Sequence, residues 1–312
     1  MIPDRQILEE ARKRIHPFIH QTPVLTCESI DNMAGAKLYF KCENFQKMGA
    51  FKMRGAANVV LQLTAKEKSK GVTTHSSGNF AQAVALSGKL TGVKATIVMP
   101  SNAPIVKKKA VLGYGAKIIE CEPTLEAREA TALQVVKDTG ATLLHPYNCY
   151  KVIAGNSSAA QELVEQVNSL DTIVAPVGGG GLISGTALAA NYFSNCTTYG
   201  AEPEGADDAF RSFKSGKLIP MIDPKTIADG LRTSLGDKGF PIILKYVKDI
   251  FTVSEQEIID ALRLIWERMK IIIEPSCAVP LAAILKNKAT FKGKKIGVII
   301  TGGNVDVKNL PF

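Results

Sequence analysis

The chain of 312 residues has no long apolar run, no clustered metal ligands and no low-complexity tract. No stretch reaches the roughly 18 apolar residues of a membrane-spanning helix. Residues 1–15 mix acids and bases and lack the apolar segment of a secretory signal. The six cysteines are scattered without a Cys-x-x-Cys pair, which argues against a zinc site and a disulfide framework. We therefore expect a cytoplasmic protein that does not enter a membrane.

Basic residues outnumber acidic ones, 38 against 29, and the formal net charge is +9. The lysines are nevertheless spread along the chain, with one short run at Lys107–Lys109 and no stretch that interleaves basic and aromatic side chains. Such stretches are typical of nucleic-acid binding, so we expect no nucleic-acid partner. A basic surface also attracts small anionic ligands.

Short β-rich apolar runs alternate with alanine-rich helical patterns almost throughout. This alternation predicts an α/β fold with mostly parallel sheets. We expect strands at 37–42, 71–74, 95–99, 117–121, 172–177, 198–201 and 296–301. We expect helices at 80–91, 127–138, 158–167 and 182–193. The strand–helix units between residues 71 and 147 indicate a small sheet inserted into a larger one.

Four consecutive glycines, Gly178–Gly181, follow the apolar run at 172–177 and precede a helical pattern. Glycine lets an anion approach the backbone closely, and a helix start offers unpaired N–H groups and a positive dipole end. The loop therefore predicts a phosphate site. Its spacing differs from GxxxxGK[S/T] and from GxGxxG, which disfavours a dinucleotide oxidoreductase. A plain flexible turn is the alternative.

Lys52 follows Phe51 in an apolar setting, just before a helical run. Desolvation lowers the pKa of a lysine and prepares its amine to attack an aldehyde, although a solvated surface position is the default for any single lysine. Ser76–Asn79 form a polar turn at a helix start, which fits either an ordinary N-cap or a carboxylate-binding turn. Thr301 follows the last apolar run, where a hydroxyl would bond a ring nitrogen without protonating it.

Together these motifs resemble the fold-type II pyridoxal-phosphate enzymes, the tryptophan synthase β-like group, and within it the branch of serine racemases and serine/threonine dehydratases. The resemblance runs from HQTPVLTCESI at 20–30 to TGGNVD at 301–306. It implies two lobes, each with a twisted, mostly parallel sheet flanked by helices. A large cofactor-binding domain would comprise 1–70 and 148–312, and a small, mobile domain that closes on substrate would comprise 71–147.

The resemblance also implies how pyridoxal 5′-phosphate (PLP) would be held. Lys52 in AFKMRGA would carry it as a Schiff base, and Phe51 would pack against its ring. Asn79 would bond its phenolic oxygen, and Thr301 would contact the pyridine nitrogen. The phosphate would lie on Gly178, Gly179, Gly180 and Gly181.

The implied reactions take place at the α-carbon of serine or threonine. Racemisation needs a proton removed on one face and returned on the other, and Lys52 and Ser77 would supply that pair. β-Elimination to a keto acid (pyruvate or 2-oxobutanoate) and ammonia needs only Lys52 and a leaving hydroxyl. The residues implied to hold the substrate are Ser76, Ser77, Asn79, Arg128 and Thr233.

Two further sites are implied by the same resemblance. The carboxylates of Glu202 and Asp208 and the carbonyl of Ala206 would bind magnesium, with calcium or manganese as alternatives, because hard oxygen ligands suit such ions. An acidic surface turn is the plainer alternative. ATP would bind as an activator at the interface of a homodimer, at Gln82, Tyr114, Asn304 and Asp306.

The sequence departs from the family pattern near the implied substrate pocket. Phe80 replaces the histidine that usually follows SSGN, AGNSS at 154–158 replaces AGQGT, and Tyr147 differs from the vertebrate-like pattern. These departures leave a dedicated L-threonine/L-serine or 3-hydroxyaspartate ammonia-lyase open as an alternative. A binding protein on a retired enzyme scaffold is the alternative of another class, and Lys52 argues against it.

Overall fold

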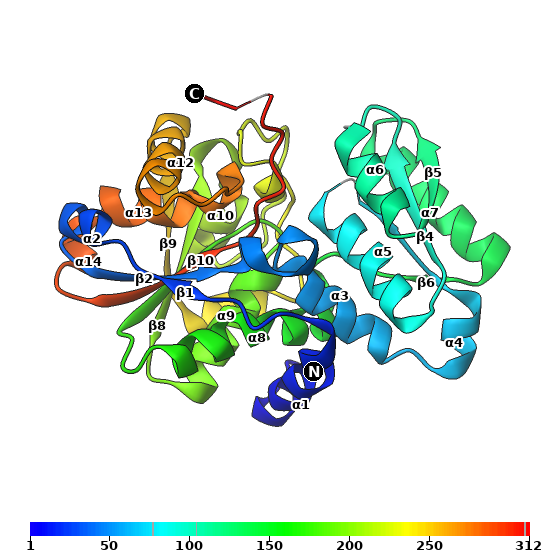
Figure 1. The fold of residues 1–312 in the computed structure, drawn as a ribbon, viewed down its shortest axis with the longest axis horizontal. Coiled ribbons are helices and arrows are strands. Elements are labelled where there is room, and N and C mark those ends of the chain that lie inside the picture. The colour runs from blue at the N-terminus through cyan, green and yellow to red at the C-terminus, as the bar shows by residue number, and fades with distance from the viewer. Residues whose placement is uncertain (77, 104, 309) are drawn as a thin grey trace.

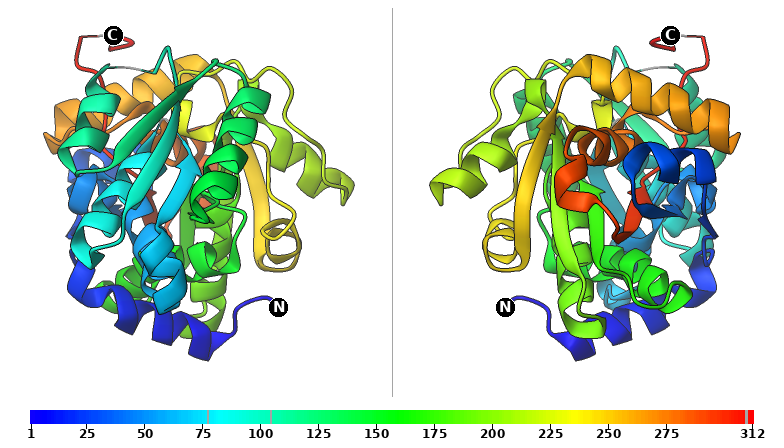
Figure 2. Two further views of the ribbon diagram at one scale, coloured as in Figure 1. Left: turned by 90° about the vertical axis from the view of Figure 1, so that its right-hand side faces the viewer. Right: turned by 90° about the vertical axis from the view of Figure 1, so that its left-hand side faces the viewer.

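Two lobes form the structure, a computed structural model that describes residues 1–76, 78–103, 105–308 and 310–312. Each lobe has its own sheet (Figure 1). The views in Figure 2 show helices on both sides of the strands. The predicted fold class, an α/β fold of two lobes with mostly parallel sheets, is confirmed. The predicted domain bounds stay a prediction.

The larger sheet has six strands among the described residues, in the order β1-β2-β10-β7-β8-β9. Every pairing is parallel except that of β1 with β2. Strand β7 is buried along its whole length, as expected for a parallel sheet with both faces covered. The strands are β1 (Val24–Leu25), β2 (Lys37–Cys42), β7 (Thr172–Pro176), β8 (Thr197–Pro203), β9 (Val247–Val253) and β10 (Lys295–Ile300).

The helices that surround this sheet are mostly short, and α8 is the longest of them. α3 contacts α8 on one side and α5 of the smaller lobe on the other, so it lies where the lobes meet. These helices are α1 (Arg5–Ile15), α2 (Glu28–Ala34), α3 (Lys52–Leu61), α8 (Tyr150–Gln166), α9 (Gly181–Phe193), α10 (Asp208–Ser215), α11 (Phe240–Tyr246), α12 (Glu255–Met269), α13 (Val279–Lys286) and α14 (Lys288–Phe291).

The smaller sheet has four parallel strands in the order β5-β4-β3-β6. They are β3 (Val72–His75), β4 (Ala95–Pro100), β5 (Lys117–Cys121) and β6 (Thr142–Leu143). Its helices are α4 (Ala65–Lys70), α5 (Asn79–Thr91), α6 (Ile105–Gly113) and α7 (Leu125–Thr139). No helix in the described part of the chain is both long and apolar enough to span a membrane.

The predicted helix at 158–167 is too short, because α8 begins at Tyr150. Its early turns hold residues that usually weaken a helix. Tight packing requires the smallest of them, since a Cβ on Gly155 would lie 2.5 Å from the carbonyl oxygen of Arg54 in α3. The hydroxyls of Ser157 and Ser158 are satisfied inside the helix by carbonyls three residues back, at 2.7 Å.

Candidate active site

Lys52 opens helix α3 at the junction of the lobes. Its Nζ donates to the carbonyl oxygen of Pro146 at 3.1 Å and lies 5.0 Å from the ring of Phe51 and 5.9 Å from that of Phe80. Burial lowers the pKa of Lys52 to about 8, against the opposing effect of Glu274. A partly neutral amine in an aromatic enclosure suits attack on an aldehyde.

The glycine loop lies between β7 and α9 and is buried. Within the described residues, the N–H groups of Gly178, Gly179 and Gly180 donate no hydrogen bond to the protein. Buried N–H groups normally have a partner, and here they precede the 13-residue helix α9. These unpaired donors at a helix start fit a phosphate group, so the loop is compatible with PLP.

Tyr147 packs against the glycine loop at Gly179 and Gly181. A Cβ on Gly179 would lie 2.3 Å from the tyrosine ring, which leaves room for glycine only. Burial raises the pKa of Tyr147, and a hydrogen bond with Thr233 opposes that rise. The hydroxyl of Thr233 would lie 3.4 Å from a Cβ on Gly178. The predicted substrate residue Thr233 therefore lies beside the predicted phosphate loop.

Thr301 follows β10 and is nearly fully buried. Its carbonyl accepts from the N–H of Phe51 at 2.9 Å, which joins the end of β10 to the residue before Lys52. Its hydroxyl lies 3.1 Å from Sγ of Cys277. Burial raises the pKa of Cys277, so this thiol stays neutral. The pair can offer a neutral donor to a ring nitrogen and no charged acid.

Asn79 belongs to a chain of hydrogen bonds between the lobes. Its amide Nδ2 donates to both carboxylate oxygens of Glu274 at 3.0 Å, and its Oδ1 accepts from Nδ2 of Asn304 at 2.8 Å. Burial raises the pKa of Glu274 to about 7. Because Glu274 takes the donor of Asn79 here, the predicted bond from Asn79 to a phenolic oxygen stays a prediction.

A buried network of charged side chains is centred on Arg54, two residues after Lys52 in α3. Arg54 donates two hydrogen bonds to Glu43, at 2.6 and 2.7 Å, and two to Glu162, at 2.7 and 2.8 Å. Lys41 also donates to Glu162 at 2.6 Å. All four side chains are at most 4% exposed. The network joins α3 to β2 and α8, and so fixes the helix that begins with Lys52.

The other residues predicted to hold substrate lie on the smaller lobe. Ser76 follows β3, and its hydroxyl accepts from the N–H of Gly78 at 3.4 Å. Arg128 lies on α7, where its Nε donates to the carbonyl of Thr124 at 3.2 Å, so it points along its own helix. Ser77, the predicted second acid/base residue, lies outside the described residues.

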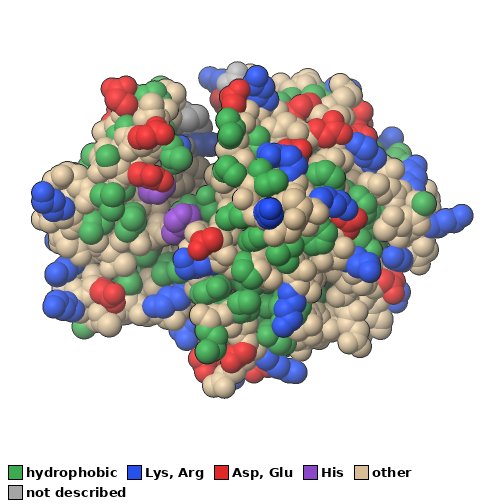
Figure 3. All heavy atoms as spheres, turned by 180° about the vertical axis from the view of Figure 1, so that it is seen from behind, with side chains coloured by type: hydrophobic (Ala, Val, Ile, Leu, Met, Phe, Trp, Pro, Cys, Tyr) green, Lys and Arg blue, Asp and Glu red, His purple; other side chains and the backbone are tan. Residues whose placement is uncertain are grey.

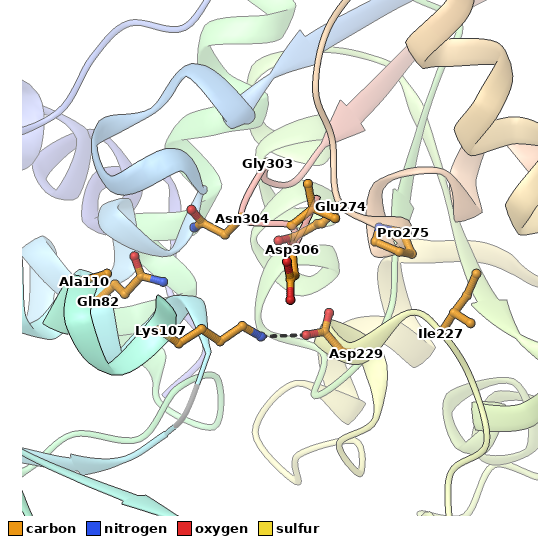
Figure 4. A pocket seen from close by; sticks show the side chains of 11 residues that line it. Gln82, Lys107, Ala110, Ile227, Asp229, Glu274, Pro275, Gly303, Asn304 and Asp306 are labelled. Atoms are coloured by element: carbon orange, nitrogen blue, oxygen red, sulfur yellow. Dashed lines mark hydrogen bonds and ion pairs between the residues drawn. The ribbon is translucent and has the colours of Figure 1, made fainter. Parts of the chain in front are cut away.

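A pocket of about 420 Å³ lies between the lobes (Figure 4). It gathers three of the four residues predicted to bind ATP: Gln82, Asn304 and Asp306. Tyr114, the fourth, is not among the lining residues and packs against the apolar core of the smaller lobe. The pocket also contains Glu274, Lys107 and Asp229, which the sequence reasoning missed.

The predicted metal residues lie together at the end of β8 and in the turn and helix that follow it. Glu202 accepts from the N–H groups of Ala209 and Phe210, at 3.3 and 2.7 Å. Asp208 accepts from the N–H of Leu235 with Oδ2 at 2.7 Å, whereas its Oδ1 has no partner within the described residues. Burial raises the pKa of both carboxyls, that of Asp208 to about 6.

Two buried carboxyls with an unpaired oxygen fit a cation, which would remove the cost of burying their charge. The described residues contain no group of three or more His, Cys, Asp or Glu side chains placed to hold a metal ion. A cation here would therefore also need carbonyl or water oxygens. The carbonyl of Ala206, the buried residue of the 3₁₀ turn Glu204–Ala206, stays the predicted third ligand.

Of the three pocket residues that the sequence did not predict, one has a recognisable sequence pattern and two do not. Glu274 is a lone acid that follows three isoleucines in the segment IIIEP. An isolated acid next to an apolar run could have been predicted to be a buried carboxyl with a functional role. Lys107 and Asp229 come from different lobes, and no local pattern connects them.

Residues 15–302 match the family model described as pyridoxal-phosphate dependent enzyme. The chain is 49% identical to beta-hydroxyaspartate dehydratase of Paracoccus denitrificans, over 100% of this chain and 99% of the relative. It is 50% identical to serine racemase of Dictyostelium discoideum, over 97% and 95%. The crystal structure of the Dictyostelium protein superposes with a TM-score of 0.93, covering 97% of this chain and 99% of that one. The chain therefore belongs to the family of pyridoxal-phosphate dependent enzymes.

Proposed function

We propose that this protein is a serine racemase that also eliminates water from serine and threonine, giving pyruvate or 2-oxobutanoate and ammonia. The observation that carries the proposal is Lys52, a desolvated amine connected through Pro146 and Tyr147 to a loop of buried N–H groups that have no partner among the described residues. The similarity to a serine racemase of Dictyostelium discoideum supports the choice of reaction.

The protein's own residues divide the work. The glycine loop binds the phosphate of PLP, Phe51 packs against the ring, and Thr301 bonds the ring nitrogen without charging it. When bound, PLP supplies an electron sink for the α-carbon of the substrate. Lys52 removes or returns the α-proton on one face, and Ser77 does so on the other. Elimination needs Lys52 alone, together with departure of the β-hydroxyl as water.

Substrate binding uses the turn after β3 and Arg128, both on the smaller lobe, together with Thr233 on the larger lobe. The turn of Ser76, Ser77 and Asn79 holds the α-carboxylate, Arg128 approaches when the smaller lobe closes, and Thr233 lies at the far side beside the glycine loop. For Arg128 this requires its side chain to leave the carbonyl of Thr124. Closure of the lobe 71–147 over the larger domain would exclude water from the reaction.

Two regulatory ligands belong to the same proposal. Glu202, Ala206 and Asp208 bind magnesium, or calcium or manganese in its place, beside the loop that contains Leu235. ATP binds at the pocket of Gln82, Asn304 and Asp306, with Tyr114 reached after a rearrangement, and acts as an activator in a cytoplasmic homodimer. The Oδ1 of Asp208, which has no partner in the described part of the chain, supports the metal site, and the lining of the pocket supports the ATP site.

The second candidate is a dedicated ammonia-lyase for L-threonine and L-serine or for 3-hydroxyaspartate. The similarity to beta-hydroxyaspartate dehydratase of Paracoccus denitrificans favours it. The two candidates share Lys52 and PLP, and they differ in the need for a second proton carrier on the opposite face.

The test is incubation of the purified enzyme with L-serine, with and without magnesium and ATP, followed by separation of the enantiomers and assay of pyruvate. The proposal expects both D-serine and pyruvate. Pyruvate without D-serine would leave the ammonia-lyase as the function.

The Ser77→Ala variant should lose racemisation far more than elimination, and equal losses would count against a two-base reaction. Lys52→Ala should lose the visible absorption band of the bound cofactor.

A further inference from the structure

His145 lies in the segment that returns from the smaller lobe to the larger one, between β6 and α8. The next residue, Pro146, accepts the hydrogen bond of Lys52 Nζ at 3.1 Å. The imidazole ring packs edge-on against Tyr147, with 4.6 Å between ring centroids, and Tyr147 in turn covers the glycine loop. His145 thus adjoins the two residues that contact the reactive amine and the phosphate loop.

The hydrogen bonds of His145 determine its protonation. Nδ1 is the acceptor for two backbone N–H groups, those of Asn148 at 2.9 Å and Tyr147 at 3.3 Å. A ring nitrogen that accepts carries no proton, so the neutral ring must carry its proton on Nε2. Within the described residues, Nε2 makes no hydrogen bond. His145 therefore presents a fixed donor that has no protein partner there.

The surroundings of this donor are electropositive. Burial, together with the neighbouring His75, Lys52 and Lys238, lowers the pKa of His145 to about 4, against the weaker effect of Asp237. That aspartate is engaged by Asn148, whose Nδ2 donates to it at 2.6 Å. Histidine side chains lie in the groove between the lobes in Figure 3.

His75 belongs to the same part of the groove. It ends β3, one residue before the turn predicted to hold the α-carboxylate. The charged groups that face it are Glu129 and Arg128, and burial lowers its pKa as well. A neutral donor with the ammonium groups of Lys52 and Lys238 nearby matches an anionic oxygen of a ligand better than a methyl group or a second cation.

We propose that His145 is a specificity-determining residue, whose Nε2–H binds the second carboxylate of a β-hydroxy dicarboxylic amino acid such as 3-hydroxyaspartate. This inference rests on the proposed function and assigns a residue to recognition of the dicarboxylic substrate that the second candidate names. Serine offers no second carboxylate, and threonine offers a methyl group there. In elimination the α-proton passes to Lys52 and the β-hydroxyl leaves as water. Hydrolysis of the released enamino acid then gives the 2-oxo dicarboxylate and ammonia.

Two substitutions of His145 distinguish the role of Nδ1 from that of Nε2. In His145→Asn, the side-chain oxygen lies near the position of Nδ1 and still accepts from the backbone, but the Nε2 donor is lost. In His145→Gln, an amide donor lies near the position of Nε2 and the turn loses its acceptor. We expect the Asn variant to lower the ratio of kcat/KM for 3-hydroxyaspartate to that for L-serine by roughly ten- to one-hundredfold, as loss of a hydrogen bond to a charged group implies. The Gln variant should keep most of that ratio while melting at a lower temperature.

His16→Asn is the matched control, because His16 is exposed in the 3₁₀ turn His16–Phe18 that follows α1, and it should change neither ratio nor stability. An unchanged ratio in His145→Asn overturns the proposal and leaves His145 as a turn residue. A second readout is independent of turnover: nitrogen NMR of the labelled enzyme, assigned with the Asn variant, should show the Nε2–H tautomer near neutral pH. An Nδ1–H signal would contradict the proposal. Absence of any product from either amino acid would instead refute the proposed function.

Discussion

Lys107 on the smaller lobe donates to Asp229 on the larger lobe, with 2.8 Å between Nζ and Oδ2 (Figure 4). This ion pair crosses the pocket between the lobes. Lys107 comes from α6, and Asp229 opens the 3₁₀ turn Asp229–Leu231. The next residue, Gly230, is anchored by its N–H to the hydroxyl of Ser276 at 3.1 Å. The pair therefore connects the smaller lobe to a fixed point of the larger one.

Loss of this ion pair should weaken closure of the lobes. Partly exposed pairs contribute about 0.2–1 kcal/mol, so we expect Lys107→Met to raise the KM for L-serine by up to about fivefold, with a smaller change in kcat. Lys109→Met is the control, because Lys109 is exposed on the same helix and should leave KM unchanged. A KM equal to that of the unmodified enzyme would show that the pair does not hold the lobes together.

The carboxyl of Glu274 should make stability depend on pH. Burial raises its pKa to about 7, so the folded protein binds this proton more tightly than the unfolded chain does. That contribution is fully present below about pH 4 and is lost as the pH rises through about 7, by up to about 3 kcal/mol. Between about pH 5 and about pH 8, the melting temperature of the Glu274→Gln variant should therefore fall by fewer degrees than that of the unmodified protein.

The matched control for this experiment is Glu122→Gln, since Glu122 is an exposed carboxylate on the smaller lobe. It should leave the pH dependence of the melting temperature unaltered. If the Glu274→Gln variant and the unmodified protein lose the same number of degrees, the carboxyl is already ionised in the folded state at low pH.

Gly179→Ala should abolish cofactor binding. The new methyl group would meet the ring of Tyr147 at 2.3 Å, a distance that side chains do not tolerate, and the loop would have to move. Titration with PLP, followed by its visible absorption, should give a dissociation constant raised by more than about a hundredfold, as a displacement costing about 3 kcal/mol implies.

Gly113→Ala serves as the control for that variant, since nothing lies within 4 Å of the added Cβ. Combining Gly179→Ala with Tyr147→Ala should restore part of the affinity, because it removes the obstructing ring. If the single Gly179→Ala variant binds the cofactor normally, the loop is not the phosphate site.

Metal binding at Glu202 and Asp208 should depend on pH and on a single oxygen. Protons compete with the ion, and the pKa of Asp208 is raised to about 6 by burial. We therefore expect the rise in melting temperature on adding magnesium to be large at about pH 8 and to shrink as the pH falls through about 6. Asp208→Asn should remove the rise, whereas Asp207→Asn, which changes a partly exposed neighbour, should keep most of it. A chelator without effect on the unmodified protein would contradict the site.

Much of the fold could be predicted because buried parallel strands are apolar along their whole length. The apolar runs predict strands at 172–177 and 296–301, within one residue of the bounds of the buried strands β7 and β10. Strand β9 was missed because it lies at the edge of its sheet, where Lys248 and Asp249 interrupt the apolar pattern of VKDIFTV. A sequence window contains no sign of such an edge position.

The site could be predicted only as far as its residues lie in local motifs. Lys52 and the glycines are adjacent to helix starts and strand ends, which sequence patterns show. The partner of Asn79 is Glu274, 195 positions away, and the proton position on His145 depends on backbone groups that follow it in a turn. Relationships of these two kinds arise only when the lobes and the turn have folded.

The buried network of Arg54, Lys41, Glu43 and Glu162 has a consequence for how this protein can evolve. Two positive and two negative charges balance at a place that is shielded from solvent. Loss of any one leaves an uncompensated charge, at a cost of about 3–5 kcal/mol, which is a large share of the roughly 5–15 kcal/mol that holds a typical domain folded. Change at these positions must therefore proceed by paired replacements. A lineage that alters one of them alone loses much of its stability before it can reach a neutral alternative.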